Sequence, residues 1–403
     1  MAKLNPTAPV RATIASGLVL EELHGALFRT LAARADLDPG SQQLLVGGIG
    51  SGKTTELLMA ERWLEQQGQT FSVYIDISAE TDLSGLNSGA LLAGLGLHLT
   101  RAVSDSPAAD DAAEKKALKD AGREIKEFAY GKTETQWVAD EYDPRLEDYD
   151  PSEDDEPGHY ITRSIPGKLK PPFPALQRDI QGLRAALERL IKHIRSGHRD
   201  VVVIFDGLDR LLTPDRFWAV VHQDFRALRQ MGVAVLAAAP LSILYGQGRS
   251  VSEHFDRVHH IPTLPFEPEQ GVYLKSVLEH RGGLDLMDAD AAEVVCYASG
   301  GVLRDLITLA RDSGEDAYIQ GSDRILPVHS ASAIEQLGES YLRGLGPEQF
   351  KILRRLRKDL SFDVTSSLNI ELLVTRRVLE YSATDFRVHP ALRSLVPNGE
   401  RND

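Results

Sequence analysis

The stretch that decides the fold is Leu44-Leu45-Val46-Gly47-Gly48-Ile49-Gly50-Ser51-Gly52-Lys53-Thr54-Thr55. It fits the phosphate-binding pattern G-x-x-x-x-G-K-[ST], between a short apolar run typical of a strand and an apolar-periodic helix. Its glycines let the backbone fold around an anion, and the free amides at the helix start face that anion. The sequence therefore predicts a nucleoside triphosphate site formed by Gly47, Gly48, Ile49, Gly50, Ser51, Gly52, Lys53, Thr54 and Thr55.

Two side chains of this loop have distinct expected roles. Lys53 would reach the β- and γ-phosphates as a mobile point charge. The Thr54 hydroxyl would complete a Mg²⁺ shell that is otherwise largely water. ATP and Mg²⁺ are therefore the cofactors that we expect.

A second motif supplies the other half of such a site. Residues 201–205 are five consecutive apolar residues, followed by Asp206-Gly207-Leu208-Asp209. A strand that is apolar on both faces must be central in a sheet covered by helices on both sides, which predicts a three-layer α/β domain. Asp206 would then lie at the carboxyl end of a central strand, where it could hold Mg²⁺ opposite Thr54.

The role of Asp209 is open at this stage. It could polarise the attacking water or hold a second-shell water, or it could cap the following helix. Asp76, at the end of an expected strand over 71–76, is a weaker competitor for the duty of Asp206.

The remaining pattern alternates strands and helices and then becomes helical. We expect a helix over 21–33, another opening at Pro174, and strands over 233–239 and 258–261. Helices over 270–280, 289–299 and 302–312 follow. Arg304 lies one turn into the last of these, placed to point towards the phosphates. His259 and His260 have no acidic or nucleophilic neighbours in a recognisable arrangement, so we expect them to be structural.

Composition narrows the class of protein. At 403 residues, with 42% hydrophobic and 26% charged residues, the chain can hold two or three domains. The single cysteine, Cys296, excludes an internal disulfide and leaves no second thiolate for a metal site. Neither a signal sequence nor a bilayer-spanning run is apparent, so we expect a cytoplasmic protein without a membrane partner. The net charge of −14 argues against a chain that coats nucleic acid indiscriminately.

The negative charge is concentrated in one segment. Residues 140–156 hold ten acidic residues against Arg145 alone. Prolines interrupt the same region, and neither helical nor strand periodicity survives in it. We expect an insertion over about 105–172, helical over 112–130 and loop-like afterwards. The acidic part is either a solvated loop or a docking surface for a basic partner or for this chain's own basic segment.

The C-terminal segment is predicted to form two helices followed by a β-hairpin wing. Helices are expected over 348–358 and 370–379, and a strand, turn and strand over 380–389. Basic residues gather on these helices, at Lys351, Arg354, Arg355, Arg357, Lys358, Arg376 and Arg377. From His329 onward, however, eleven Lys and Arg stand against ten Asp and Glu. DNA binding and packing against protein therefore both remain open.

Together, GGIGSGKTT, VVVIFDGLDR and SGGVLRDL resemble the AAA+ and STAND branches of P-loop ATPases, in particular the initiator-type ATPases of origin recognition. The resemblance implies an ASCE-type P-loop NTPase core over 1–265, a helical lid over 266–328 and a winged helix over 329–403. It makes Lys53 and Thr54 the Walker A pair, Asp206 the Walker B acid and Arg304 the sensor-2 arginine. Asp209, Asp206 and Arg304 are then the candidate catalytic residues.

Two departures from the AAA+ pattern indicate slow hydrolysis. Gly207 stands where such proteins follow the metal acid with a glutamate, and the strand ending at Ala239 lacks a polar sensor-1 residue, with Ser242 as its nearest substitute. We therefore expect a regulatory ATPase switch that controls assembly or the engagement of a protein partner, for example in bacterial stress or phage defence. A protein partner and a homo-oligomer formed on ATP binding are the assemblies that we expect. The alternative is a DNA-binding initiator or mobile-element helper. Arg249 and Arg257 are the candidates for a trans-acting arginine.

Overall fold

The computed structural model describes residues 26–105, 112–130, 180–211, 213–245, 251–264, 268–282, 285–359 and 361–396. Several predictions lie outside these residues: the start of the helix over 21–33, the loop-like part of the insertion with its acidic segment 140–156, the helix start at Pro174 and the candidate arginine Arg249. The chain divides into two compact units, one of Met1–Ala79 with Ile194–Asp403 and one of Glu80–His193.

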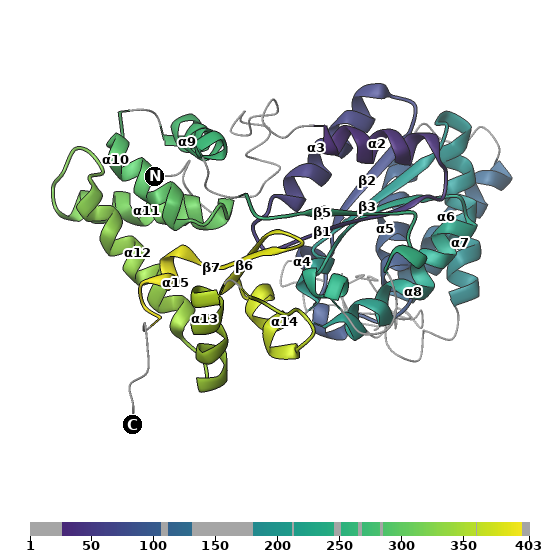
Figure 1. Cartoon of the computed structure of the whole chain (residues 1–403). Helices are drawn as coiled ribbons and strands as arrows, with labels where there is room; N and C mark the ends of the chain where they lie inside the picture. Colours follow the sequence, from purple (N-terminus) through teal and green to yellow (C-terminus); the bar gives the residue numbers. More distant parts are fainter. Residues whose placement is uncertain are drawn as a thin grey trace, which may run out of the picture. The chain divides into compact units, whose positions relative to one another are not determined.

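A parallel sheet of five strands forms the centre of the first unit (Figure 1). The strands are β1 (Gln42–Gly47), β2 (Phe71–Asp76), β3 (Val201–Asp206), β4 (Ala234–Ala239) and β5 (Arg257–Ile261), in the order β2-β3-β4-β1-β5. Every residue of β1, β3 and β4 is buried, and apart from Gln42, Gln43 and Asp206 these strands consist of apolar residues and one glycine, as expected for central parallel strands. The loops that follow β1 and β3 therefore meet at one edge of the sheet.

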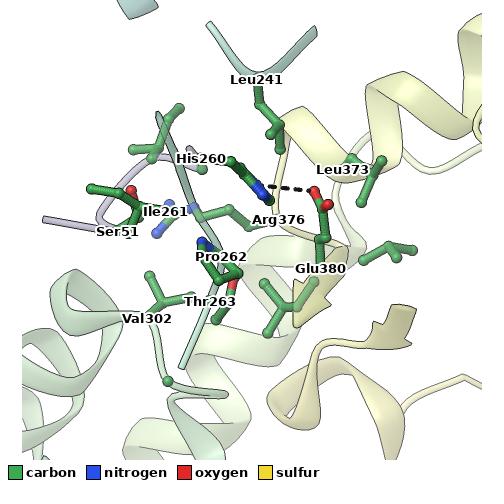
Figure 2. A pocket seen from close by; sticks show the side chains of 15 residues that line it. Ser51, Leu241, His260, Ile261, Pro262, Thr263, Val302, Leu373, Arg376 and Glu380 are labelled. Carbon is green, nitrogen blue, oxygen red and sulfur yellow. Dashed lines mark ion pairs between the residues drawn. The ribbon is translucent and has the colours of Figure 1, made fainter. Parts of the chain in front are cut away.

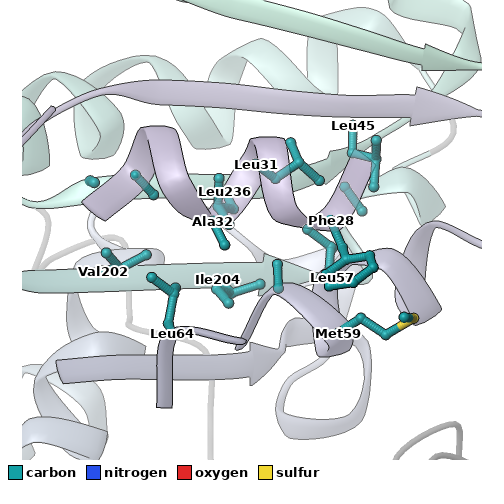
Figure 3. Close-up of a cluster of buried hydrophobic side chains, with 14 residues drawn as sticks. Phe28, Leu31, Ala32, Leu45, Leu57, Met59, Leu64, Val202, Ile204 and Leu236 are labelled. Atoms are coloured by element: carbon teal, nitrogen blue, oxygen red, sulfur yellow. The ribbon is translucent and has the colours of Figure 1, made fainter. Parts of the chain in front are cut away.

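Helices cover both faces of this sheet. On one face, α2 (Leu27–Leu37) and α3 (Lys53–Gln67) pack on alternate residues of β1, β3 and β4, with Leu31 and Leu57 in the core (Figure 3). On the other face, Phe225 of α8 (Pro214–Gln230) stacks on Phe205, with ring centroids 5.9 Å apart. The predicted three-layer α/β P-loop NTPase fold is therefore confirmed.

The second unit is helical where the structure describes it. It contains α5 (Ala90–Asp105), α6 (Ala112–Tyr130) and most of α7 (Ile180–Gly197). The predicted helix over 112–130 is confirmed as α6. A Cβ added to Gly96 would lie 2.8 Å from Ile125 Cγ2, so α5 and α6 approach too closely there for a larger residue.

The C-terminal part of the first unit holds the helices of the predicted lid and winged helix. They are α9 (Pro268–Gly282), α10 (Ala289–Ala298), α11 (Leu303–Ile319), α12 (Pro327–Leu342), α13 (Pro347–Asp359), α14 (Ser367–Val374) and α15 (Pro390–Arg393). Strands β6 (Val378–Ser382) and β7 (Asp385–Val388) pair antiparallel as the predicted wing. Helix α12, which was not predicted from the sequence, packs along α11 and α15 and so joins the two groups of helices.

One predicted helix ends too late. The pattern placed a helix over 370–379, whereas α14 stops at Val374 and Leu379 is buried in β6. The helix ends because Arg376 adopts a left-handed conformation with φ of 62°. The amides of Arg376 and Arg377 then bond back to the Leu373 and Leu372 carbonyls, which closes the helix as a Schellman motif.

Candidate functional site

The phosphate loop connects β1 to α3 at the carboxyl edge of the sheet. The chain leaves β1 at Gly47, and α3 begins at Lys53. Gly50 and Gly52 have φ of 83° and 98°, a region that residues with a side chain rarely adopt. These glycines therefore shape the loop that the motif predicts.

Lys53 is held inside this loop. The residue is 4% exposed, and Nζ donates to the carbonyls of Gly47 and Gly48, both at 2.9 Å. Nζ also lies 2.9 Å from Asp209 Oδ2. A buried ammonium requires such compensation, and the carboxylate of Asp209 supplies the negative charge in this structure.

Asp206 lies beside Thr54, as predicted. Its Oδ2 accepts a hydrogen bond from Tyr74 Oη at 2.7 Å, and Oδ1 accepts one from the Gly207 amide at 2.8 Å. Burial raises the pKa of Asp206, while hydrogen bonds from Tyr74 and Thr54 oppose that rise. The hydroxyl and the carboxylate are the hard oxygen ligands that Mg²⁺ prefers, and a cation would offset the cost of burying the charge. Thr54 and Asp206 therefore fit a Mg²⁺ ion.

The capping role considered for Asp209 is wrong. The N-cap of α8 is Thr213, whose Oγ1 accepts from the Arg216 amide at 3.4 Å. Asp209 instead lies in a short 3₁₀ turn, Leu208–Arg210, with its carboxylate on Lys53. Its proposed action on water remains a prediction.

Asp76 has a local partner that accounts for its position. It is the neighbour of Asp206 in the register of β2 and β3. Its Oδ1 accepts from the Ser78 amide at 3.0 Å and from Ser78 Oγ at 2.6 Å. The carboxylate therefore begins the short helix α4 (Ile77–Glu80).

Arg304 lies in the first turn of α11, against the phosphate loop. A Cβ added to Gly50 would lie 2.9 Å from Arg304 Cβ, so helix and loop are in close contact. Burial lowers the pKa of Arg304, and the charges of Arg376 and Arg210 lower it further. Within the part of the chain that the structure describes, no ion pair is found for its guanidinium. A cation in such surroundings is ready for an anionic ligand.

Two hydroxyls near this edge of the sheet lack partners. Ser242 is 2% exposed and lies in the 3₁₀ turn Leu241–Tyr245 that follows β4. Neither Ser242 Oγ nor Ser51 Oγ has a hydrogen-bond partner among the residues described. Buried hydroxyls are normally satisfied, so both are available to a ligand or to water.

The other residues considered from the sequence lie away from the phosphate loop or have structural contacts. Arg257 is exposed at the start of β5. His259 Nε2 lies 3.3 Å from Gln43 Oε1, and His260 Nε2 lies 3.5 Å from Glu380 Oε2. Burial lowers the pKa of His259.

The wing of the C-terminal module packs beside the phosphate loop, which the sequence did not predict. Figure 2 shows a small cavity lined by Ser51 on one side and by Arg376 and Glu380 on the other. The Thr263 amide donates to the Glu380 carbonyl at 2.9 Å, and Tyr381 Oη donates to the Gly300 carbonyl at 3.0 Å. Helix α14 also contacts the turn Leu241–Tyr245.

The basic residues of this module separate into two groups. Arg377 donates to the carbonyls of Tyr341 and Arg343, and Arg376 pairs with Asp305, so both are used within the chain. Four exposed basic residues, Lys351, Arg354, Arg355 and Lys358, lie on α13 and are spaced as neighbours on one helix face.

Two kinds of feature are absent from the described residues. These residues contain no group of three or more His, Cys, Asp or Glu side chains that could hold a metal ion. None of the helices in those same ranges combines the length and the apolar character needed to cross a membrane.

No protein-family model matches the chain, and no curated protein sequence matches it. Similar solved structures include the Aeropyrum pernix ORC2 protein in ADPNP and ADP complexes, at 14% identity over 92% of this chain and 91% of that one, with a TM-score of 0.47. The Aeropyrum pernix ORC1 protein in complex with DNA is 17% identical over 91% of this chain and 81% of that one, with a TM-score of 0.44. The Thermotoga maritima RuvB Holliday junction branch migration motor is 13% identical over 92% of each chain, with a TM-score of 0.38. Origin-recognition proteins, whose motifs the sequence resembles, are thus among the similar structures.

Proposed function

We propose that this chain is an ATP-binding, slowly hydrolysing regulatory ATPase whose nucleotide state controls assembly or the engagement of a protein partner. The observation that carries the proposal is the buried Lys53, which lies among loop carbonyls and pairs with Asp209. A buried lysine that takes one carboxylate as its counter-ion can exchange it for the β- and γ-phosphates of a nucleotide.

The same exchange would prepare Asp209 for hydrolysis. When the phosphates take Lys53, the Asp209 carboxylate is released next to Asp206 and can accept a hydrogen bond from the attacking water. Thr54 and Asp206 would hold Mg²⁺, which neutralises charge on the phosphates when bound. Gly207, in the place of a glutamate, offers no second base, which supports slow turnover.

The wing would transmit a conformational change at the nucleotide site to the surface that binds a partner. Glu380 and Tyr381 hold it to the segment after β5 and to Gly300, beside the phosphate loop. A nucleotide that repositions the loop or Arg304 would therefore change the docking of the winged helix. We retain the division into a core (1–265), lid (266–328) and winged helix (329–403) as part of this proposal.

Calorimetric titration with Mg²⁺·ATP tests the site. Lys53→Ala should abolish measurable binding, because it removes the cation that the loop directs at the phosphates. The matched control is Lys351→Ala, at an exposed lysine that pairs with Glu348 on α13. Unchanged ATP affinity in Lys53→Ala would refute the site.

A second candidate, DNA binding, is favoured by the exposed basic face of α13. Its four cations could contact phosphates of a duplex backbone. Binding to a random duplex would then weaken as salt rises, and replacing Arg354 and Arg355 by Gln would reduce the slope of log K against log salt by about 2. Salt-independent binding, or none, would leave α13 as a solvated helix face.

A further inference from the structure

Arg376 has an unusual backbone for an arginine. Among the described residues it is the one non-glycine residue with positive φ, at 62°. Residues kept in this region cluster at ligand and switch sites, because surrounding contacts must hold them there. Contacts of the side chain help to keep Arg376 in this conformation. The guanidinium pairs with Asp305 Oδ1 at 2.5 Å and lies over the Tyr341 ring, 5.5 Å from its centroid.

The same guanidinium lies near the phosphate loop. Arg376 lines the cavity that also contains Gly48 and the unpartnered hydroxyl of Ser51 (Figure 2). It is close enough to Arg304 for its charge to lower the pKa of that residue. Two arginines, one from the lid and one from the winged helix, therefore approach the phosphate site from within one chain.

Asp305 can release Arg376 without being left unsatisfied. Its Oδ2 accepts from Tyr341 Oη at 2.6 Å and lies 3.3 Å from His389 Nε2. His389 Nδ1 accepts from the Ala391 amide, which leaves Nε2 to donate to the carboxylate. A buried carboxylate that keeps the Tyr341 hydroxyl as a donor and has the His389 ring nitrogen 3.3 Å away loses much less than one left alone.

Building on the ATP site proposed above, we propose that Arg376 is a second nucleotide-sensing arginine, supplied in cis by the winged helix, which exchanges Asp305 for the terminal phosphate of a bound nucleoside triphosphate. The fork of an arginine suits a phosphate as well as a carboxylate. A nucleoside diphosphate lacks this group, so Arg376 would stay on Asp305 and the two nucleotides would be told apart by the winged helix itself.

Titrations of ATP and ADP against Arg376→Gln and Arg377→Gln test the exchange. Arg377 is the matched control, since it is adjacent in sequence and bonds to the carbonyls of Tyr341 and Arg343 instead. Arg376→Gly is the second variant, because glycine accepts the positive φ and should fold without backbone strain. Both Arg376 variants should weaken ATP about 10- to 100-fold and leave ADP within about 2-fold, as expected for loss of a charge-assisted hydrogen bond. Arg377→Gln should keep the parent ratio of ATP to ADP affinity.

The outcomes separate this inference from the proposed function. If the parent binds both nucleotides and Lys53→Ala does not, but Arg376→Gly keeps the parent ratio of ATP to ADP affinity, the ATP site stands and the exchange is refuted. Equal weakening of ATP and ADP in Arg376→Gly would also refute it, because that pattern indicates a structural role. Failure of the parent to bind ATP would refute the proposed function itself.

Discussion

At the scale of single residues, the site contains a buried carboxylate whose charge is costly without a metal. Asp206 has a pKa raised mainly by burial, so the folded state disfavours its ionised form. Its unfolded pKa is near 3.8, and stability is therefore lost as pH rises from that value towards the folded pKa. In the absence of Mg²⁺ at neutral pH, the ionised Asp206 therefore lowers the free energy of unfolding of the protein.

This predicts opposite effects of Asp206→Asn with and without metal. In EDTA at neutral pH the variant should unfold at a higher temperature than the parent, because a neutral amide replaces the buried charge. With Mg²⁺·ATP the parent should gain more stability than the variant, since the metal ligand is missing. Thermal unfolding under both conditions measures this, and identical shifts in the two proteins would contradict the metal assignment.

Asp209 and Thr213 allow a matched comparison of catalysis and capping. Asp209→Ala should lower single-turnover hydrolysis roughly 10²-fold or more, the range for loss of a general base, while ATP still binds. Thr213→Ala should cost about 1 kcal/mol of stability, because it removes the observed cap of α8, and should leave turnover per folded molecule unchanged. If Asp209→Ala hydrolyses ATP at the parent rate, its action on water is excluded.

At the scale of elements, the close approach between the lid and the segment after β5 depends on one glycine. A Cβ added to Gly301 would lie 1.6 Å from the Leu264 carbonyl oxygen, where φ is 83°. Gly321 is a suitable control, since its φ is 72° but a Cβ there meets nothing within 4 Å. The two positions share the backbone strain and differ in the clash.

We therefore expect Gly301→Ala to be much the more destabilising of the two. Gly321→Ala should cost about 1 kcal/mol or somewhat more for its left-handed backbone. Gly301→Ala should cost several kcal/mol, because the clash is with backbone and cannot be relieved by a rotamer. Denaturant unfolding measures both, and equal losses would contradict the close packing before α11.

The sequence predicted those elements whose signal is local. Five apolar residues before Asp206 require a central strand, and the glycines before Lys53 require a loop, so both halves of the site could be placed without a structure. The sequence did not predict the features that depend on contacts between residues far apart in the chain. The end of α14 depends on Arg376, whose guanidinium is held by Asp305, a residue 71 positions away in sequence. The pairing of Lys53 with Asp209 likewise joins two loops that only the folded sheet brings together.

At the scale of the whole molecule, one buried carboxylate, that of Asp305 in α11, joins the helices that follow β5 to the C-terminal segment from α12 onward. Its partners are Tyr341 of α12, Arg376 between α14 and β6, and His389 at the start of α15. Burial alone would raise the pKa of Asp305, but its bond with His389 and the charge of Arg376 lower it more. It therefore stays ionised well into acid, and its contribution to stability is lost only as pH falls below about 3.8.

The contact that should respond to nucleotide is therefore the one between the wing and the core. Hydrogen exchange in the presence of ATP or ADP tests this most directly. Helix α12, which contacts Asp305 through Tyr341, is the internal control. We predict slower exchange in α14 and β6 with ATP than with ADP, because Arg376 between them would then bind the terminal phosphate, with unchanged exchange in α12 and no nucleotide effect in Lys53→Ala. Equal exchange of α14 and β6 with ATP and ADP, when both nucleotides are bound, would contradict the proposal that this chain is a nucleotide-dependent switch.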